Sequence, residues 1–205
     1  MSEISLIDYG LANMRSVTNA VQYLGASVKV ITSGRELKNG NRIILPGVGS
    51  FASGMKGLKD RGFIEPLNEM VLHKGIPILG ICLGFQLICN FSEEGGQQGL
   101  GWINADIIRF ENSKNFNVPH IGWNDVYFNE HKSLFAEMQS PVNFYFVHSY
   151  YLPVTENVQQ ISAGTCDYGI KFVAAIEKEN IMACQFHPEK SQMAGLKLLE
   201  NFLSV

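Results

Sequence analysis

Residues 76–86 constrain the fold of this chain more than any other segment. They read IPILGICLGFQ, in which a short apolar run leads to Cys82 between Gly80 and Gly84. The apolar run is typical of a buried strand, and apolar residues then recur at near-helical spacing over 85–91. The pattern predicts a strand that turns abruptly into a helix at Cys82.

A turn of this kind carries the nucleophile in G-x-S-x-G enzymes, and here sulfur would replace the serine oxygen. The flanking glycines leave space where side chains would collide with the neighbouring strand and helix. The helix start also favours the thiolate, because its dipole and free N–H groups stabilise negative charge. The alternative is a buried cysteine without chemistry, which is the common situation of a free thiol. The paired glycines favour the nucleophile.

Strands and helices alternate before this segment. The expected strands are 4–7, 28–31 and 42–45, and the expected helices follow Asn13 and span 51–72. Gly25 is expected to end the first helix, and Gly62 or Pro66 to interrupt the second. Alternation of this kind gives right-handed βαβ units and a mainly parallel sheet.

Strands dominate after Ser92. The expected ones are 100–110, 124–128, 142–152, 158–166, 171–177 and 181–186, followed by a closing helix over 193–203. Strands with so little helix between them favour antiparallel pairing. We therefore predict one α/β domain over 1–205, with a three-layer, open, mainly parallel sheet, helices on both faces and an antiparallel edge extension.

Composition narrows the class of protein. The chain has 205 residues, 46% of them hydrophobic and 17% charged, which is enough for one well-packed core. A net charge of -3 without a basic run argues against a nucleic-acid binder, and no apolar run reaches membrane-spanning length. The four cysteines lack C-x-x-C spacing, so no metal site is expected. Without a signal-peptide pattern, we expect a cytoplasmic chain with reduced thiols.

His187 is the candidate base for Cys82. It follows the apolar run 181–184, which places it at a strand end, the catalytic edge of open α/β sheets. Glu189, two residues on, can accept a hydrogen bond from one ring nitrogen and leave the other for the sulfur. The alternative is a lone surface histidine beside a turn proline, and the cysteine turn makes that the weaker interpretation.

Acyl transfer also needs N–H donors for the developing oxyanion. Leu83, directly after the nucleophile, offers one, and the turn PGVG at 46–49 offers another from Gly47 or Val48. The same turn matches a dinucleotide-binding pattern, G-x-G-x-x-A. We discount that interpretation because the turn is not in the first βα unit and no acidic residue ends a following strand.

Several motifs, in their order along the chain, carry a resemblance to a known family. They are DYG at 8–10, PGVG at 46–49, GICLGFQ at 80–86, PHIGWN at 119–124, YFVHSY at 145–150 and QFHPE at 185–189. Together they resemble class I, or triad-type, glutamine amidotransferases, and among these the glutaminase subunits of imidazole glycerol phosphate synthases. The resemblance covers essentially the whole chain.

The resemblance implies a reaction that needs no metal or organic cofactor. Family members hydrolyse glutamine to glutamate and ammonia with a cysteine nucleophile, a histidine that moves protons and a glutamate that orients it. The matching residues here are Cys82, His187 and Glu189. Positions that match substrate-binding residues are Gln86, Glu94, Ser149 and Tyr150, with Glu93 as an alternative to Glu94.

The resemblance also implies a partner. Such glutaminase subunits form heterodimers with a cyclase subunit, a (β/α)₈ barrel that receives ammonia through a channel and makes imidazole glycerol phosphate in histidine biosynthesis. The residues that match positions facing the cyclase are Trp123, Asn124, Tyr145 and Lys190. The alternative places the two aromatic side chains in the core and Lys190 in solvent. His148, inside an apolar strand, is expected to be structural.

Three rival functions stay open at this point. A paralogous glutaminase would supply ammonia to an enzyme that amidates surface sugars. The more distant rivals are a non-catalytic nucleotide-binding regulatory module and a cysteine peptidase. For the favoured function, we expect glutamine hydrolysis to be slow alone and raised by the cyclase.

Overall fold

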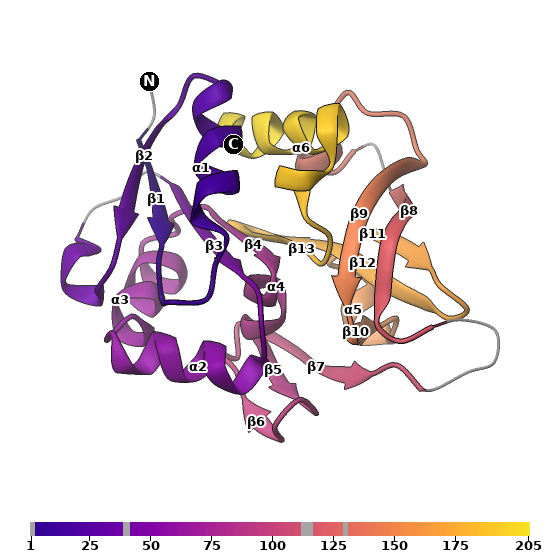
Figure 1. Ribbon diagram of the computed structural model, residues 1–205, viewed down its shortest axis with the longest axis horizontal. Coiled ribbons are helices and arrows are strands. Elements are labelled where there is room, and N and C mark those ends of the chain that lie inside the picture. The colour runs from indigo at the N-terminus through magenta and orange to yellow at the C-terminus, as the bar shows by residue number, and fades with distance from the viewer. Residues whose placement is uncertain (1–2, 39–41, 112–116, 129–130) are drawn as a thin grey trace.

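Five parallel strands form the centre of the fold in the computed structural model, which describes residues 3–38, 42–111, 117–128 and 131–205 (Figure 1). Their order is β2-β1-β3-β4-β13, and every neighbouring pair is parallel. They span Ser27–Ile31, Glu3–Ile7, Arg42–Gly47, Ile78–Cys82 and Ile181–Cys184. β4 and β13 are buried along their whole length, as expected of strands covered on both faces.

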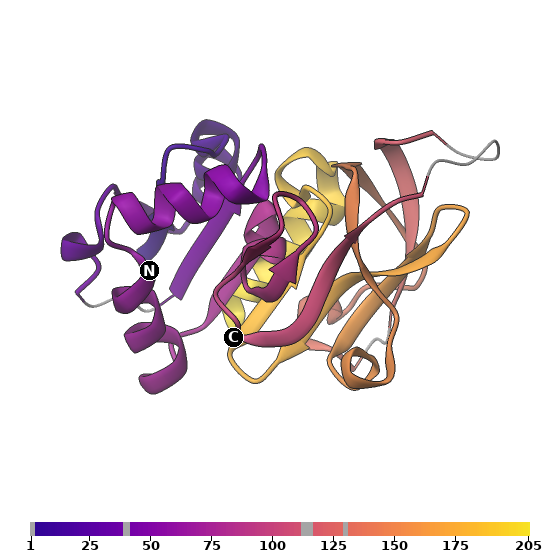
Figure 2. The same cartoon turned by 90° about the horizontal axis from the view of Figure 1, so that it is seen from below.

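Beyond β13 the sheet becomes mainly antiparallel, passing through β12 and β10 to β7, β5 and β6, while β11, β8 and β9 branch from β12. These strands are β5 Cys89–Ser92, β6 Gln97–Gln98, β7 Ile103–Arg109, β8 His120–Phe128, β9 Val142–His148, β10 Tyr150–Pro153, β11 Ser162–Asp167 and β12 Lys171–Lys178. Figure 2 shows this half beside the parallel half. The expected antiparallel extension is confirmed.

Helices cover both faces of the parallel strands (Figure 1). One face packs against α1 Met14–Tyr23 and α6 Gln192–Ser204, which share a hydrophobic core with alternate residues of the strands. The other face packs against α2 Phe51–Asp60, α3 Ile64–Asn68 and α4 Leu83–Leu87. In β4, for example, Leu79 and Ile81 face the first core and Ile78 the second. The predicted three-layer arrangement is therefore confirmed.

Short elements complete the described chain: η1 Gly34–Glu36, the π-helical turn η2 Glu69–His73, η3 Ser133–Phe135, α5 Glu156–Gln159 and η4 Pro188–Lys190. The expected helix boundaries hold at two places. Asn13 caps α1 by accepting a hydrogen bond from the Ser16 N–H, and Gly25 follows its end with a φ of +82°.

Of two further helix predictions, one is confirmed and one is wrong. The region 51–72 is interrupted at Gly62, whose φ is +67°, whereas Pro66 lies in the first turn of α3, where its missing N–H costs nothing. The helix after Cys82 ends at Leu87, so the expected continuation to residue 91 is wrong. Residues 89–92 form β5 instead, and pairing with β6 and β7 supplies partners for their backbone groups.

We expect Gly84→Ala to destabilise the fold. A Cβ at residue 84 would lie 1.8 Å from the Leu45 carbonyl oxygen, so α4 would have to move away from β3. The free energy of unfolding should fall by about 1–3 kcal/mol, measured by urea denaturation. Gly62→Ala is the matched control, because nothing lies within 4 Å and only its positive φ carries a cost, of about 1 kcal/mol. A smaller loss at residue 84 than at residue 62 would contradict the expectation.

Candidate active site

Strand order explains why distant motifs meet. β3, β4 and β13 are parallel neighbours, so their carboxyl ends lie at one edge of the sheet. Gly47, the last residue of β3, is directly opposite Cys82, the last residue of β4. His187 follows β13 by three residues. The sheet therefore brings the candidate nucleophile, base and oxyanion turn to the same edge.

Cys82 occupies the predicted turn between strand and helix. Its φ of +53° and ψ of -105° form a strained conformation for a residue with a side chain, and such strain is typical of catalytic turns. The turn is tight because Gly80 and Gly84 lack Cβ atoms: a Cβ at residue 80 would contact the Gly84 carbonyl at 2.9 Å. The glycine argument from the sequence is confirmed, and it leaves the sulfur at the start of α4.

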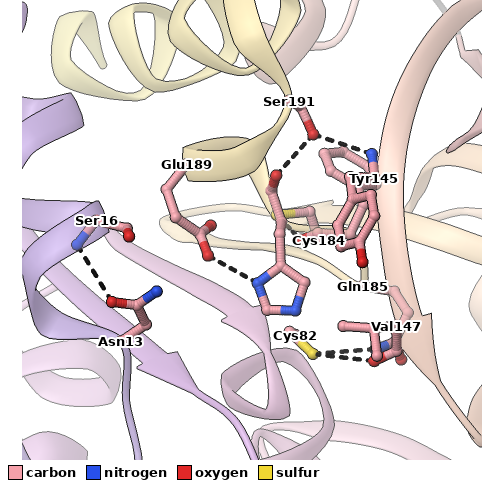
Figure 3. Close-up of polar contacts among 11 residues, drawn as sticks. Asn13, Ser16, Cys82, Tyr145, Val147, Cys184, Gln185, Glu189 and Ser191 are labelled. Atoms are coloured by element: carbon pink, nitrogen blue, oxygen red, sulfur yellow. Dashed lines mark hydrogen bonds and ion pairs between the residues drawn. The ribbon is translucent and has the colours of Figure 1, made fainter. Parts of the chain in front are cut away.

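The Nδ1 atom of His187 lies 2.8 Å from Glu189 Oε1, the contact drawn as a dashed line from Glu189 in Figure 3. Both side chains are almost fully buried. His187 Nε2 is buried and has no hydrogen-bond partner in the described chain. Two contacts with β9 fix the histidine backbone. The His187 N–H donates to the Tyr145 carbonyl at 2.9 Å, and Ser191 Oγ bridges the His187 carbonyl and the Tyr145 N–H.

Several influences determine the proton affinity of His187. Burial lowers its pKa, since the charged ring is desolvated. The negative charge of the Cys82 sulfur, contact with that sulfur and the hydrogen bond to Glu189 together outweigh burial and raise the pKa to about 10. At neutral pH the ring is therefore protonated beside the sulfur, which is the state that stabilises a thiolate.

The backbone groups predicted to bind the oxyanion differ in the contacts that they already make. The Leu83 N–H opens α4, where a helix leaves its first N–H groups without intrahelical partners. The Val48 N–H instead donates to the Leu11 carbonyl oxygen at 2.8 Å, so it already has a hydrogen-bond partner. Gly47 packs so closely on the Tyr9 hydroxyl that a Cβ there would lie 1.9 Å from it. The oxyanion roles of all three residues stay predictions, and Leu83 is the one whose N–H lies at the start of a helix.

A pocket of about 290 Å³ opens beside Cys82 and His187. All four residues predicted to hold substrate line it, together with Val48 and Leu83: they are Gln86, Glu94, Ser149 and Tyr150. Between the two adjacent acids, Glu94 faces the pocket, and its carboxylate also accepts the Phe51 N–H at 2.7 Å. Glu93 turns elsewhere, because its carboxylate accepts the Arg109 N–H.

Three of the four predicted interface residues form a cluster. Trp123 and Tyr145 are paired across β8 and β9, and their rings meet edge to face with centroids 6.0 Å apart. Lys190 Nζ lies 5.7 Å from the centre of the Tyr145 ring, and Trp123 is 46% exposed. Asn124 points to the other face of β8, where it donates to the Asp167 carbonyl at 3.0 Å. Its place at an interface stays a prediction.

Some polar residues near the site had no assigned role from the sequence. Gln185 is fully buried, and its Nε2 donates to Cys82 Sγ at 3.9 Å. His120 Nδ1 lies 3.0 Å from His148 Nε2, because the two residues are paired across β8 and β9. Both histidines and Gln185 belong to recognisable motifs, but their contacts depend on strand register. His148 is confirmed as a hydrogen-bonded, buried histidine.

The described ranges hold neither a metal-binding cluster nor a membrane-spanning helix. No group of three or more histidine, cysteine, aspartate or glutamate side chains there is arranged to hold a metal ion. None of the helices described has the length and apolar composition needed to cross a membrane.

Comparison with known families decides the identity of this arrangement. The family model for class I glutamine amidotransferases matches residues 5–205. The chain is a class I glutamine amidotransferase. This amidotransferase is 45% identical over 201 residues to imidazole glycerol phosphate synthase subunit HisH 1 of Campylobacter jejuni (strain RM1221), with 98% of each chain covered.

Other relatives agree with this placement. The amidotransferase is 44% identical over 200 residues to imidazole glycerol phosphate synthase subunit HisH 2 of a Methanococcus maripaludis strain, again with 98% of each chain covered. Among solved structures, PurLQS from Thermotoga maritima has a TM-score of 0.75 at 17% identity, covering 100% of this chain and 99% of that one. The structural likeness shows the same fold.

We expect Cys82→Ala to lower the pKa of His187. The sulfur supplies both a negative charge and a direct contact that raise this pKa, so without it burial weighs more heavily. An NMR titration of the ring signals measures the change, with the exposed ring of His73 as the internal reference. An unchanged His187 titration would show that the sulfur and the imidazole do not interact.

Proposed function

We propose that this amidotransferase hydrolyses glutamine to glutamate and ammonia with Cys82 as nucleophile. The observation that carries the proposal is the buried, unpartnered Nε2 of His187 in the pocket that Cys82 also lines. A pocket of about 290 Å³ suits a free amino acid. The family match and the relatives named as imidazole glycerol phosphate synthase subunits support the same reaction.

The first half of the reaction forms a thioester. The Cys82 thiolate attacks the carboxamide carbon, a C–S bond forms, and the carbonyl electron pair moves onto oxygen. The Leu83 N–H faces this developing charge. His187 gives its Nε2 proton to the amide nitrogen, the C–N bond breaks and ammonia leaves. Its raised pKa keeps this proton available at neutral pH, and Glu189 holds the ring.

The second half releases the product. Water attacks the thioester carbon, and His187, now neutral, accepts a proton from that water. The C–S bond breaks, which returns the thiolate and releases glutamate. Because the Glu94 carboxylate lines the pocket, it can bind the α-ammonium group of the substrate, while the turn at Ser149 and Tyr150 offers backbone groups to its carboxylate.

The oxyanion turn supports slow hydrolysis in the isolated chain. A second donor requires the peptide between Gly47 and Val48 to give up its bond to Leu11 and turn toward the sulfur. The cost of breaking this bond falls on the free enzyme unless something else stabilises the turned state. A partner that binds near the site can supply that stabilisation, which accords with activation by a second subunit.

We propose that the partner is a cyclase subunit with a (β/α)₈ barrel, which uses the ammonia to make imidazole glycerol phosphate in histidine biosynthesis. The relatives' names support this pathway over the sugar-amidating paralogue. The cluster of Trp123, Tyr145 and Lys190 supports the contact surface, because Tyr145 also binds the backbone of His187. A partner bound there would touch the segment that carries the base.

The single connected sheet supports one domain over 1–205, and four free cysteines fit the reducing conditions of the cytoplasm.

We expect Glu189→Gln to reduce glutamine hydrolysis strongly. The variant loses the charged acceptor of His187 Nδ1, so the ring is neither oriented nor charged as before. The value of kcat/KM, measured as glutamate release with the cyclase present, should fall roughly 100-fold. Glu200→Gln, an exposed change on α6, is the control and should be neutral. Equal activity in the two variants would argue against the triad.

We expect Trp123→Ala to weaken binding of the cyclase. Exposed aromatic side chains of this kind dominate interface energies, so the cyclase concentration for half-maximal activation should rise about tenfold or more. Tyr23→Ala removes an equally prominent aromatic ring, 75% exposed, from α1 and should change nothing. A titration that is the same for both variants would place the partner elsewhere.

A further inference from the structure

The catalytic sulfur lies at one end of a buried chain of hydrogen bonds, in which the mechanism above gives no role to Gln185. Gln185 Nε2 donates to Cys82 Sγ at 3.9 Å. Gln86 Nε2 lies 2.9 Å from Gln185 Oε1 and 3.2 Å from the Tyr150 carbonyl oxygen. Gln185 is fully buried and Gln86 is 5% exposed. Buried amides need hydrogen-bond partners, and here those partners form a chain that runs from the Tyr150 carbonyl to the thiol.

The Tyr150 carbonyl decides which atom of each amide is the donor. A backbone carbonyl only accepts, so the Gln86 atom that faces it is the NH₂ group. That group also faces Gln185, whose nearer atom must therefore be the carbonyl oxygen. The remaining NH₂ group of Gln185 then faces Cys82. The orientation at the sulfur follows from the chemistry of a backbone group and does not depend on telling nitrogen from oxygen.

A second arm holds the same carbonyl from the other side. His148 Nδ1 lies 2.8 Å from the Tyr150 oxygen and must carry the proton, so its Nε2 accepts from His120 Nδ1 at 3.0 Å. Burial lowers the pKa of His148 to about 3 and that of His120 to about 4, so both rings are neutral at pH 7. With two donors on it, the carbonyl is a fixed reference for both amides.

We propose that Gln185 stabilises the Cys82 thiolate by presenting to it an amide N–H whose direction is set by Gln86 and the Tyr150 carbonyl. Gln185 contacts the reacting sulfur, whereas Gln86 and His148 act through their neighbours as positioning residues. A donor aimed at a thiolate favours the charged form over the neutral thiol. The inference deepens the proposed function, because it concerns how the same nucleophile is kept reactive.

Alkylation of Cys82 by iodoacetamide tests the proposal without glutamine or a partner. The reagent is neutral and reacts with the thiolate. The other cysteines are more deeply buried than Cys82, and burial raises the pKa of Cys166 to about 12 and the pKa values of Cys89 and Cys184 above their usual range. Peptide mapping therefore follows Cys82 alone. The Val147 carbonyl oxygen also lies 4.0 Å from this sulfur. The other ionisable groups that interact with its charge are His187, Tyr9 and Cys184, and every variant below retains all of these groups.

Two substitutions remove the donor in different ways. Gln185→Met is apolar and of similar length, so it deletes the N–H without adding charge. Gln185→Glu keeps an acceptor for Gln86 and places a carboxylate oxygen at the sulfur. We expect the alkylation rate at pH 7 to fall about tenfold in Q185M and further in Q185E. In both variants the midpoint of the pH profile should move upward, a change that a loosened structure alone would not produce.

Asn201→Asp is the matched control. It makes the same amide-to-acid change at a buried position of α6, where the amide donates to the Leu134 and Ala136 carbonyls. It should lower stability and leave the alkylation profile in place. Circular dichroism checks that each variant is folded, and Q185M decides the question if Q185E is not folded.

The proposal is overturned if the pH profiles of alkylation in the Gln185 variants match that of the intact chain. It is also overturned if N201D shows an equal shift. Failure of the intact chain to hydrolyse glutamine counts against the proposed function alone.

Discussion

The close approach of α4 to β3 is the constraint on which the active site depends. Without a Cβ at Gly84, the helix lies directly against the Leu45 carbonyl of the neighbouring strand. A helix that begins so near the sheet leaves room for a single turning residue, and Cys82 takes that place with a φ of +53°. The strain of this conformation is borne by the packing of the two core clusters around it. Its result is a sulfur atom that projects from the strand end toward the residues after β13.

Burial and charge act against each other at the imidazole. His187 and Glu189 are almost fully withdrawn from solvent, which by itself disfavours a charged ring. The sulfur and the carboxylate reverse that effect, because electrostatic attraction is stronger where water is excluded. The site thus keeps a proton donor shielded from solvent, and the same low dielectric strengthens any donor that faces the oxyanion. Tyr9, behind the oxyanion turn, shows the opposite outcome: burial first, and then the charge of Cys82, raise its pKa and keep it neutral.

Sequence patterns were sufficient to predict those features of the fold and site that follow from the local spacing of residues. Glycines at 80 and 84 specified the turn, and alternation of strands with helices specified the parallel order that gathers β3, β4 and β13. They were insufficient to predict features that depend on which backbone groups hydrogen-bond to each other across the fold. The helix after Cys82 is short because β5 pairs with its neighbours, and the pairing of His120 with His148 depends on strand register. The orientation of the Val48 N–H depends on the Leu11 carbonyl, which no side-chain pattern reports.

The backbone of His187 is bonded to Tyr145 of β9, so the antiparallel half of the sheet holds the candidate base in place as well as forming a surface. The two halves are consequently not interchangeable modules. In a chimera of two relatives, a crossover between β12 and β13 would take the imidazole from one parent and the β9 strand that contacts its backbone from the other. Crossovers that keep β8, β9 and the segment after β13 from one parent would preserve these backbone contacts. The segments that form the active site of this enzyme are therefore discontinuous in the chain. Recombination between homologues has to keep together segments that are far apart in sequence but in contact in the fold.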